Sequence, residues 1–123
     1  MSEKTTYLKK RRMAFKYAGR GVQRLIRGEA HARIHTIAMF AVVALGILLH
    51  ITPTEWCLVA LCIGGVFMAE AFNTAIEKLA DRVSREEDPL IGAAKDVAAG
   101  GVLLMSIAAA AIGLIIFLPK ILV

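Results

Sequence analysis

Three long apolar stretches dominate the sequence and restrict the folds open to it. They run through residues 34–51, 56–79 and 97–118. Each is close to the ~20 residues that a helix needs to cross a hydrocarbon core about 30 Å thick. Lipid offers no partner for backbone N–H and C=O groups, so stretches of this kind are expected to form helices. The sequence therefore predicts an all-α integral membrane fold with three transmembrane helices.

Composition agrees with a membrane protein and argues against a soluble domain. Of the 123 residues, 58% are hydrophobic and only 20% are charged, with a mean hydropathy of +0.65. A soluble chain of this length leaves too much surface exposed to hide so many apolar side chains. We expect one domain over residues 1–123, with transmembrane helices at about 31–51, 55–81 and 90–119.

The distribution of positive charge predicts the orientation in the membrane. Ten of the 15 Lys and Arg residues precede His35, and four more lie between Lys78 and Lys95. The link between the first two stretches, residues 52–55, has none. By the positive-inside tendency, the N-terminus and the second link are cytoplasmic. The net charge of +5 is explained by this anchoring, so we expect a membrane partner and no nucleic acid.

Residues of about 7–28 have the pattern of an amphipathic surface helix. Apolar side chains such as Phe15 and Leu25 fall on one side of a 3.6-residue period, and basic ones such as Lys16 and Arg24 fall on the other. Such a helix is well placed on the anionic cytoplasmic leaflet. Glu29, at its end, is the only acidic residue between Glu3 and Glu55.

A polar stripe runs along the second apolar stretch. Glu70, Asn73, Glu77 and Asp81 fall within an arc of roughly 80° on a helix. Ionisable groups inside a membrane span are costly and normally face a bundle interior or a watery cavity. Because four polar residues share one face, the pattern favours a functional site over an isolated structural contact.

Spacing separates the roles within this stripe. Glu70 and Glu77 lie about 10 Å apart along a helix axis, too far to hold one Mg²⁺ together easily. The deeper Glu70 suits a general base that takes a proton from an alcohol. Glu77, at the cytoplasmic interface, would need a second carboxylate to bind metal, and Glu29 is the nearest candidate by topology.

Other polar residues near the second link add to this interpretation. Residues 82–89 are polar and turn-like, and Lys95 and Asp96 open the third stretch. A lysine there could neutralise charge on a transferred phosphate, although both residues could equally be simple interfacial groups. No G-x-x-x-x-G-K-[ST] loop occurs, so an ATP site would not be a P-loop. For His31 and His35, interfacial contacts are favoured over a shared metal, and His35 is a further candidate for a lipid or nucleotide contact.

These residues resemble a known signature. The run Glu70-x-x-Asn73-Thr74-Ala75-Ile76-Glu77-x-x-x-Asp81 is similar to that of the prokaryotic diacylglycerol kinase family, and Ala94-Lys95-Asp96 and Glu29 fit the same family. The similarity covers nearly the whole chain. Within the family the chain looks most like the Gram-positive undecaprenol kinases. The residues behind that finer assignment are Ala18-Gly19-Arg20-Gly21, His35, Glu55-Trp56, Ile63-Gly64-Gly65 and residues 113–120.

The resemblance implies a homotrimeric, Mg²⁺- and ATP-dependent lipid kinase in the bacterial cell membrane, with its active site facing the cytoplasm. It implies that Glu70 is the catalytic base and contacts the substrate, and that Glu29 and Glu77 bind the metal. The implied ATP contacts are Lys10, Tyr17, Glu29, Asn73, Glu77, Glu86, Asp88, Lys95 and Asp96. Phe72, Ala80 and Asp88 depart from the usual family pattern, and the change at Asp88 bears on adenine or ribose contact.

The resulting hypothesis is phosphorylation of a lipid alcohol, undecaprenol to undecaprenyl phosphate, with diacylglycerol to phosphatidic acid as the alternative. A proton-coupled transporter using Glu70 is a rival of another class, because intramembrane carboxylates serve that purpose elsewhere. That reading leaves Glu29, Glu77 and Lys95 without a role. A non-catalytic packing subunit is a third option, and it predicts that Glu70 and Glu77 tolerate substitution.

Overall fold

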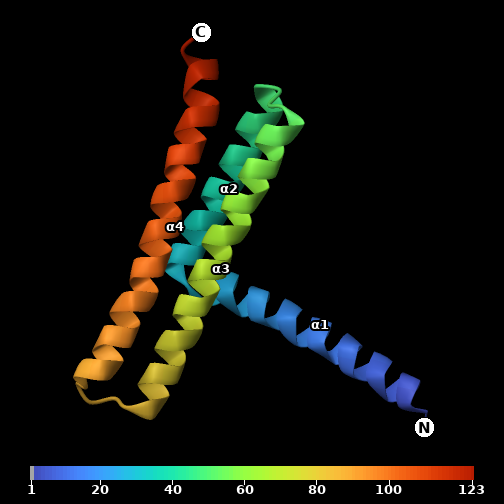
Figure 1. The fold of residues 1–123 in the computed structure, drawn as a ribbon, viewed down its shortest axis with the longest axis vertical. Coiled ribbons are helices and arrows are strands. Elements are labelled where there is room, and N and C mark those ends of the chain that lie inside the picture. Colours follow the sequence, from blue (N-terminus) through green and yellow to red (C-terminus); the bar gives the residue numbers. More distant parts are fainter. Residues whose placement is uncertain (1) are drawn as a thin grey trace.

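Four helices make up nearly all of the computed structural model, which describes residues 2–123 (Figure 1). They are α1 (Glu3–Gly28), α2 (Ala30–Leu48), α3 (Pro53–Val83) and α4 (Pro89–Ile121). The last three are long and apolar enough to cross a membrane, which confirms the all-α prediction with three candidate spans. The expected surface helix falls within α1, and its placement on a membrane stays a prediction.

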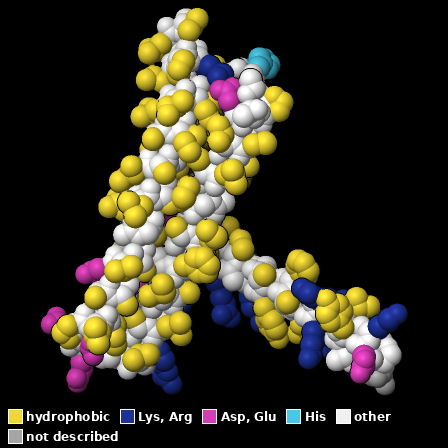
Figure 2. All heavy atoms as spheres, in the orientation of Figure 1, with side chains coloured by type: hydrophobic (Ala, Val, Ile, Leu, Met, Phe, Trp, Pro, Cys, Tyr) yellow, Lys and Arg dark blue, Asp and Glu magenta, His cyan; other side chains and the backbone are white. Residues whose placement is uncertain are grey.

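Helices α2, α3 and α4 run side by side, whereas α1 leads away from them at a steep angle (Figure 1). α3 packs mainly against α4. At most 22% of the most apolar window of each spanning helix is buried inside the chain. Apolar side chains accordingly cover the outside of the three helices, while charged side chains gather at the two ends and along α1 (Figure 2). This surface requires cover by lipid or by other protein.

The change of direction between α1 and α2 is made at one residue. Glu29 has an extended backbone (φ −115°, ψ 125°) and lies between the two helices as C-cap of the first and N-cap of the second. Arg33 of α2 then donates from Nη2 to the Arg27 carbonyl at 2.6 Å. That bond satisfies one of the carbonyls left open where α1 ends.

The connection between α2 and α3, residues 49–52, is short, and we call this end of the bundle the turn end. His50 has a positive φ of 51°, which stops α2. Thr52 and Glu55 form a capping box: the Glu55 N–H donates to Thr52 Oγ1, and Glu55 Oε1 accepts from the Thr52 N–H. Pro53 occupies the first turn of α3, where its missing N–H costs nothing.

The compact hydrophobic core lies at the turn end. Ile51, Val59, Ile116 and Phe117 form its buried centre. Trp56 packs against Gly46 so closely that a Cβ at Gly46 would lie 2.8 Å from the indole. The ion pair between Lys120 Nζ and Glu55 Oε2, at 2.6 Å, ties the C-terminal part of α4 to the start of α3 beside this core.

The connection between α3 and α4, residues 84–88, defines the opposite link end. Asp88 caps α4, because its Oδ1 accepts from the backbone N–H of Leu90 at 2.9 Å and of Ile91 at 3.3 Å. Pro89 follows in the first helical turn. Lys95 Nζ pairs with Asp81 Oδ1 at 2.5 Å, which joins the last turns of α3 to the first turns of α4.

Candidate functional site

Glu70 is the one buried charged residue in the part of the chain that the structure describes, with 5% of its surface exposed. It lies in the middle of α3, and its Oε1 is 3.0 Å from His35 Nε2 on α2. His35 is half-buried. Burying a charge away from water is costly unless it is paired, so this contact is an important part of the local structure.

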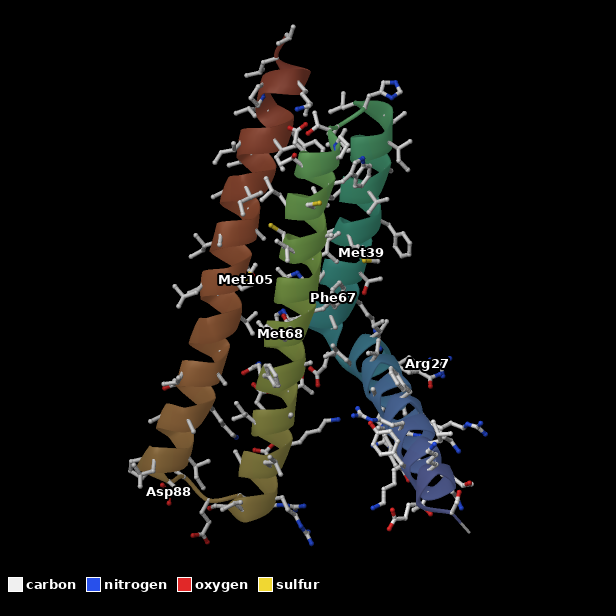
Figure 3. All side chains as sticks on the ribbon, turned by 45° about the vertical axis from the view of Figure 1, so that its right-hand side comes forward. Arg27, Met39, Phe67, Met68, Asp88 and Met105 are labelled. Atoms are coloured by element: carbon white, nitrogen blue, oxygen red, sulfur yellow. The ribbon has the colours of Figure 1, made fainter. Side chains whose placement is uncertain are left out.

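An apolar cavity of about 270 Å³ opens beside this pair, between α2, α3 and α4. His35 lines it, together with Met39 of α2 and Phe67 of α3, which are labelled in Figure 3. Of its 15 lining residues, only His35 and Ser106 carry a side-chain nitrogen or oxygen. The cavity is therefore suited to a hydrocarbon segment whose polar end lies near His35 and Glu70.

Position along α3 places these groups at different depths. Counted from Pro53, Glu70 lies about 26 Å along the helix axis and Glu77 about 36 Å. A hydrocarbon core is about 30 Å thick. If the turn end lies at one membrane boundary, this count puts Glu70 just inside the opposite boundary and Glu77 just beyond it. The carboxylate of Glu70 would then be at the depth of lipid, and that of Glu77 at the depth of water.

Asn73 lies between them and has an open acceptor. Its Oδ1 is buried and has no hydrogen-bond partner within residues 2–123. Buried polar atoms are normally satisfied, so an orphan of this kind needs a partner from elsewhere. Asp81, the last member of the stripe, is exposed and is engaged by Lys95.

A polar cavity of about 540 Å³ occupies the link end. It brings together three of the residues expected to contact ATP, Glu86, Asp88 and Lys95, and Asp81 also lines it. Asp96 is exposed on α4, next to Lys95 in sequence. The Asp88 carboxylate already caps α4, a structural task that the sequence interpretation did not assign to it.

A second polar cavity, of about 480 Å³, lies where α1 meets α3. Its charged lining is entirely basic: Arg20, Arg24, Arg27 and Lys78. Gly28 and Lys78 are both in its wall. Glu29 follows Gly28 in the sequence and Glu77 precedes Lys78, and both glutamates are half-buried. The arrangement places four cations around a space that can hold an anionic ligand.

Of the two predicted nucleotide contacts on α1, only Lys10 lies apart from this region. Tyr17 is exposed, and the guanidinium of Arg20, which lines the second polar cavity, is 5.7 Å from its ring centroid. Lys10 lies about 27 Å along α1 from Gly28, on the part of the helix that leads away from the bundle (Figure 1). A single chain in this conformation does not bring Lys10 to the other candidate residues.

Among residues 2–123, no group of three or more His, Cys, Asp or Glu side chains is arranged to hold a metal ion. A metal would therefore depend on two carboxylates and on oxygens from a ligand.

The sequence interpretation missed the pairing of His35 with Glu70. The signal that could have suggested it is a histidine in an otherwise apolar span, which requires a polar partner.

Comparison with known proteins identifies the family. The family model described as prokaryotic diacylglycerol kinase matches residues 16–117. The chain belongs to the prokaryotic diacylglycerol kinase family. The undecaprenol kinase of Bacillus subtilis (strain 168) is 42% identical over 107 residues, which cover 87% of each chain. The diacylglycerol kinase of Synechocystis sp. is 37% identical over 111 residues, 89% of this chain and 63% of that relative.

Membership of this family decides between the enzyme, transporter and packing-subunit hypotheses. The chain is a lipid kinase with several apolar helices suited to a membrane, and a kinase uses ATP as its phosphate donor. The transporter and packing-subunit hypotheses are thereby set aside. The resemblance seen in the sequence is confirmed, while the roles of individual residues remain predictions.

Proposed function

We propose that the chain transfers the γ-phosphate of ATP to the hydroxyl group of undecaprenol, with Glu70 as the catalytic base. The observation that carries this proposal is a buried carboxylate in contact with His35, which lines an apolar cavity, in a chain of a lipid kinase family. A base must meet the lipid hydroxyl where the lipid is. The rise per residue of α3 supports Glu70 for this role, because it puts this residue just inside the boundary opposite the turn end.

The shape of the cavity supports a single-chain alcohol. Its volume of about 270 Å³ is below the ~300–1,000 Å³ of typical small-molecule sites, so it accommodates a short piece of one chain. Undecaprenol carries one chain on its reacting carbon, and the Bacillus subtilis relative named undecaprenol kinase is 42% identical. Diacylglycerol is the second candidate, because a relative at 37% identity is named diacylglycerol kinase.

The residues at the link end fit a magnesium nucleotide. Mg²⁺ usually binds one or two carboxylates together with substrate phosphates and water, and Glu29 and Glu77 are chain neighbours of Gly28 and Lys78 in the wall of the basic cavity. The unpartnered Asn73 Oδ1 offers a further oxygen. When bound, the metal would neutralise charge on the phosphates. We assign Glu29 and Glu77 to the metal, and these two with the remaining predicted contacts to ATP: Lys10, Tyr17, Asn73, Glu86, Asp88, Lys95 and Asp96.

The chemical step follows from this placement. The lipid oxygen attacks the γ-phosphorus in line, and the bond from that phosphorus to the β,γ-bridging oxygen breaks to release ADP. Glu70 takes the hydroxyl proton as the new O–P bond forms. Lys95 and the basic cavity supply positive charge on the side from which the nucleotide arrives. Catalysis on this scheme is mainly positioning and charge neutralisation.

Orientation and assembly complete the proposal. The positive charges of α1 and of the link end support a cytoplasmic position for both at the bacterial membrane, with α1 along the leaflet. We further propose a homotrimer. The exposed apolar faces of α2 to α4 and the distance of Lys10 from the rest of the site support a contribution from a second copy.

The test measures labelled-phosphate transfer from ATP by the purified protein, with undecaprenol and with diacylglycerol as acceptors. We expect preference for undecaprenol and a loss of about 10²–10⁴-fold in Glu70→Gln, the range for removal of a general base. Preference for diacylglycerol would overturn the choice of lipid alone. Full activity of a folded Glu70→Gln would overturn the base assignment.

A further inference from the structure

His35 is the one polar side chain that contacts Glu70 in the part of the chain described by the structure. The distance from Nε2 to Oε1 is 3.0 Å, a close polar contact between the two helices. Glu70 is buried, with 5% exposure, whereas His35 is half-buried and lines the apolar cavity. The contact therefore joins the carboxylate proposed as base to the wall of the cavity proposed for the lipid chain.

The chemistry of the two groups sets what a hydrogen bond across this contact requires. A carboxylate oxygen accepts, so Nε2 must carry the hydrogen, and in a neutral imidazole Nδ1 is then free. A neutral donor holds Oε1 without adding a positive charge that would weaken the carboxylate as a base. The second oxygen, Oε2, has no side-chain partner within residues 2–123 and is left open.

The rate of proton transfer to Glu70 depends on where its carboxylate is held. A glutamate has three side-chain torsions, and no other polar side chain of the described chain fixes Glu70. Reacting groups misplaced by about 1 Å lose about 10²-fold in rate. A hydrogen bond across the contact with His35 would remove that freedom, because His35 belongs to the neighbouring helix α2.

We propose that His35 is a positioning residue: its Nε2–H holds Oε1 of Glu70 so that Oε2 faces the hydroxyl of the lipid alcohol. The inference rests on the proposed function, in which Glu70 is the base. In the transfer step, the hydroxyl proton moves to Oε2 of Glu70 and the lipid oxygen bonds to phosphorus. His35 keeps its own proton throughout and does not exchange it with the substrate.

Three variants test this role against a merely structural one. His35→Ala removes the donor, and we expect kcat to fall about 10–100-fold, as for other residues that orient a functional group. The KM for ATP should stay unchanged, because ATP is expected at the link end. His35→Gln places an amide N–H at a reach similar to Nε2, so it should recover most of the lost kcat.

His31→Ala is the matched control. His31 lies one turn earlier on α2, is exposed, and makes no side-chain hydrogen bond or ion pair among the described residues. It should leave kcat unchanged. Thermal unfolding in detergent, measured for every variant, separates loss of catalysis from loss of fold.

The outcomes distinguish this inference from the proposed function. Full kcat in His35→Ala, with Glu70→Gln inactive, would overturn the positioning role and keep the base. A folded His35→Gln as inactive as His35→Ala would also overturn it, since the imidazole itself would then be needed to move the proton. If Glu70→Gln is fully active, the base assignment fails regardless of His35.

A measurement on the wild type keeps the inference testable if the variants do not fold. Nitrogen NMR of the protein labelled in histidine should show His35 as the neutral Nε2–H tautomer, with its hydrogen-bonded signal changed in Glu70→Gln. A neutral Nδ1–H tautomer in the wild type would overturn the proposal, because Nε2 would then have no hydrogen to donate.

Discussion

At the turn end, both charged residues that approach the bundle have a partner in the same chain, whereas around the basic cavity between α1 and α3 several cations have none within residues 2–123. Lys120 and Glu55 pair at 2.6 Å beside the buried core. Around the basic cavity, by contrast, Arg24, Arg27 and Lys78 form no ion pair within residues 2–123. The charges at the turn end are therefore neutralised within the chain, whereas the cations of the basic cavity are available to an anionic ligand.

Packing follows the same division. The hydrophobic core, the Trp56–Gly46 contact and the capping box of Thr52 all lie at the turn end. The link end has exposed acidic and basic side chains, one ion pair and a capped helix start. Stability is thus expected to depend on the turn end and catalysis on the link end and the adjoining Glu70. Substitutions at each end should have separable effects.

The largest effect is expected at the link end, from Glu77→Gln. Losing a proposed metal ligand removes several kcal/mol of charge stabilisation in the transition state, which corresponds to a fall of about 10²-fold or more in kcat/KM. Partial recovery at high Mg²⁺ concentration should accompany it. Thermal unfolding in detergent should change little, because the core is remote. A stable variant with normal activity and normal Mg²⁺ dependence would break the comparison.

The turn end should show the opposite behaviour in Gly46→Ala. The added Cβ would lie 2.8 Å from Trp56 and 3.0 Å from Ile51, so the core must shift. Overpacking of this kind costs about 1–3 kcal/mol, measured as a lower midpoint of thermal unfolding with kcat retained by the folded fraction. Gly64→Ala is the control, because nothing lies within 4 Å of its Cβ. Equal midpoints for the two variants would show that the turn end is not tightly packed.

The apolar cavity extends from the core residues Val59 and Phe117 to His35, and Ala109→Phe should sharpen the comparison by filling it. If the cavity holds the lipid chain, the ring displaces about two methylene groups, each worth about 0.8 kcal/mol when buried. The KM for undecaprenol should then rise about tenfold, and the KM for ATP should not. Ala108→Phe, at a neighbouring exposed position outside the cavity, is the control. An unchanged lipid KM in the Ala109 variant would remove the cavity from the lipid site.

The sequence predicted the helices well because their signals are local. Apolar runs of membrane length, Pro at the starts of α3 and α4, and the acid-free basic stretch of α1 can each be read from neighbouring residues. The Asp88 cap was also readable, since an acceptor before Pro89 is a standard helix start. The family resemblance gives Asp88 only a role in ATP binding, and the cap is therefore absent from the sequence interpretation.

The pairing of His35 with Glu70 could not be read in the same way. It depends on how α2 is rotated against α3, and α2 is apolar on nearly all sides, so hydrophobic periodicity indicates no inward face. The direction of α1 is similarly hidden, because it depends on the extended backbone of Glu29. The position of Lys10 relative to the site follows from that direction, and a partner copy would change it.

The smallest effect is expected at Asp88, where two roles meet in one carboxylate. Removing the cap in Asp88→Ala should lower the free energy of unfolding by about 1 kcal/mol, within the range for N-cap loss. Asp88→Ser keeps an acceptor for the Leu90 N–H but removes the negative charge, so the unfolding midpoint should be retained. The KM for ATP then decides the second role. A changed KM in both variants assigns the carboxylate to the nucleotide, whereas a change in Asp88→Ala alone means that Asp88 acts only by holding the start of α4. An equal loss of stability in the serine variant would contradict the cap itself, in which the N–H groups of Leu90 and Ile91 donate to Asp88 Oδ1 and fix the start of α4.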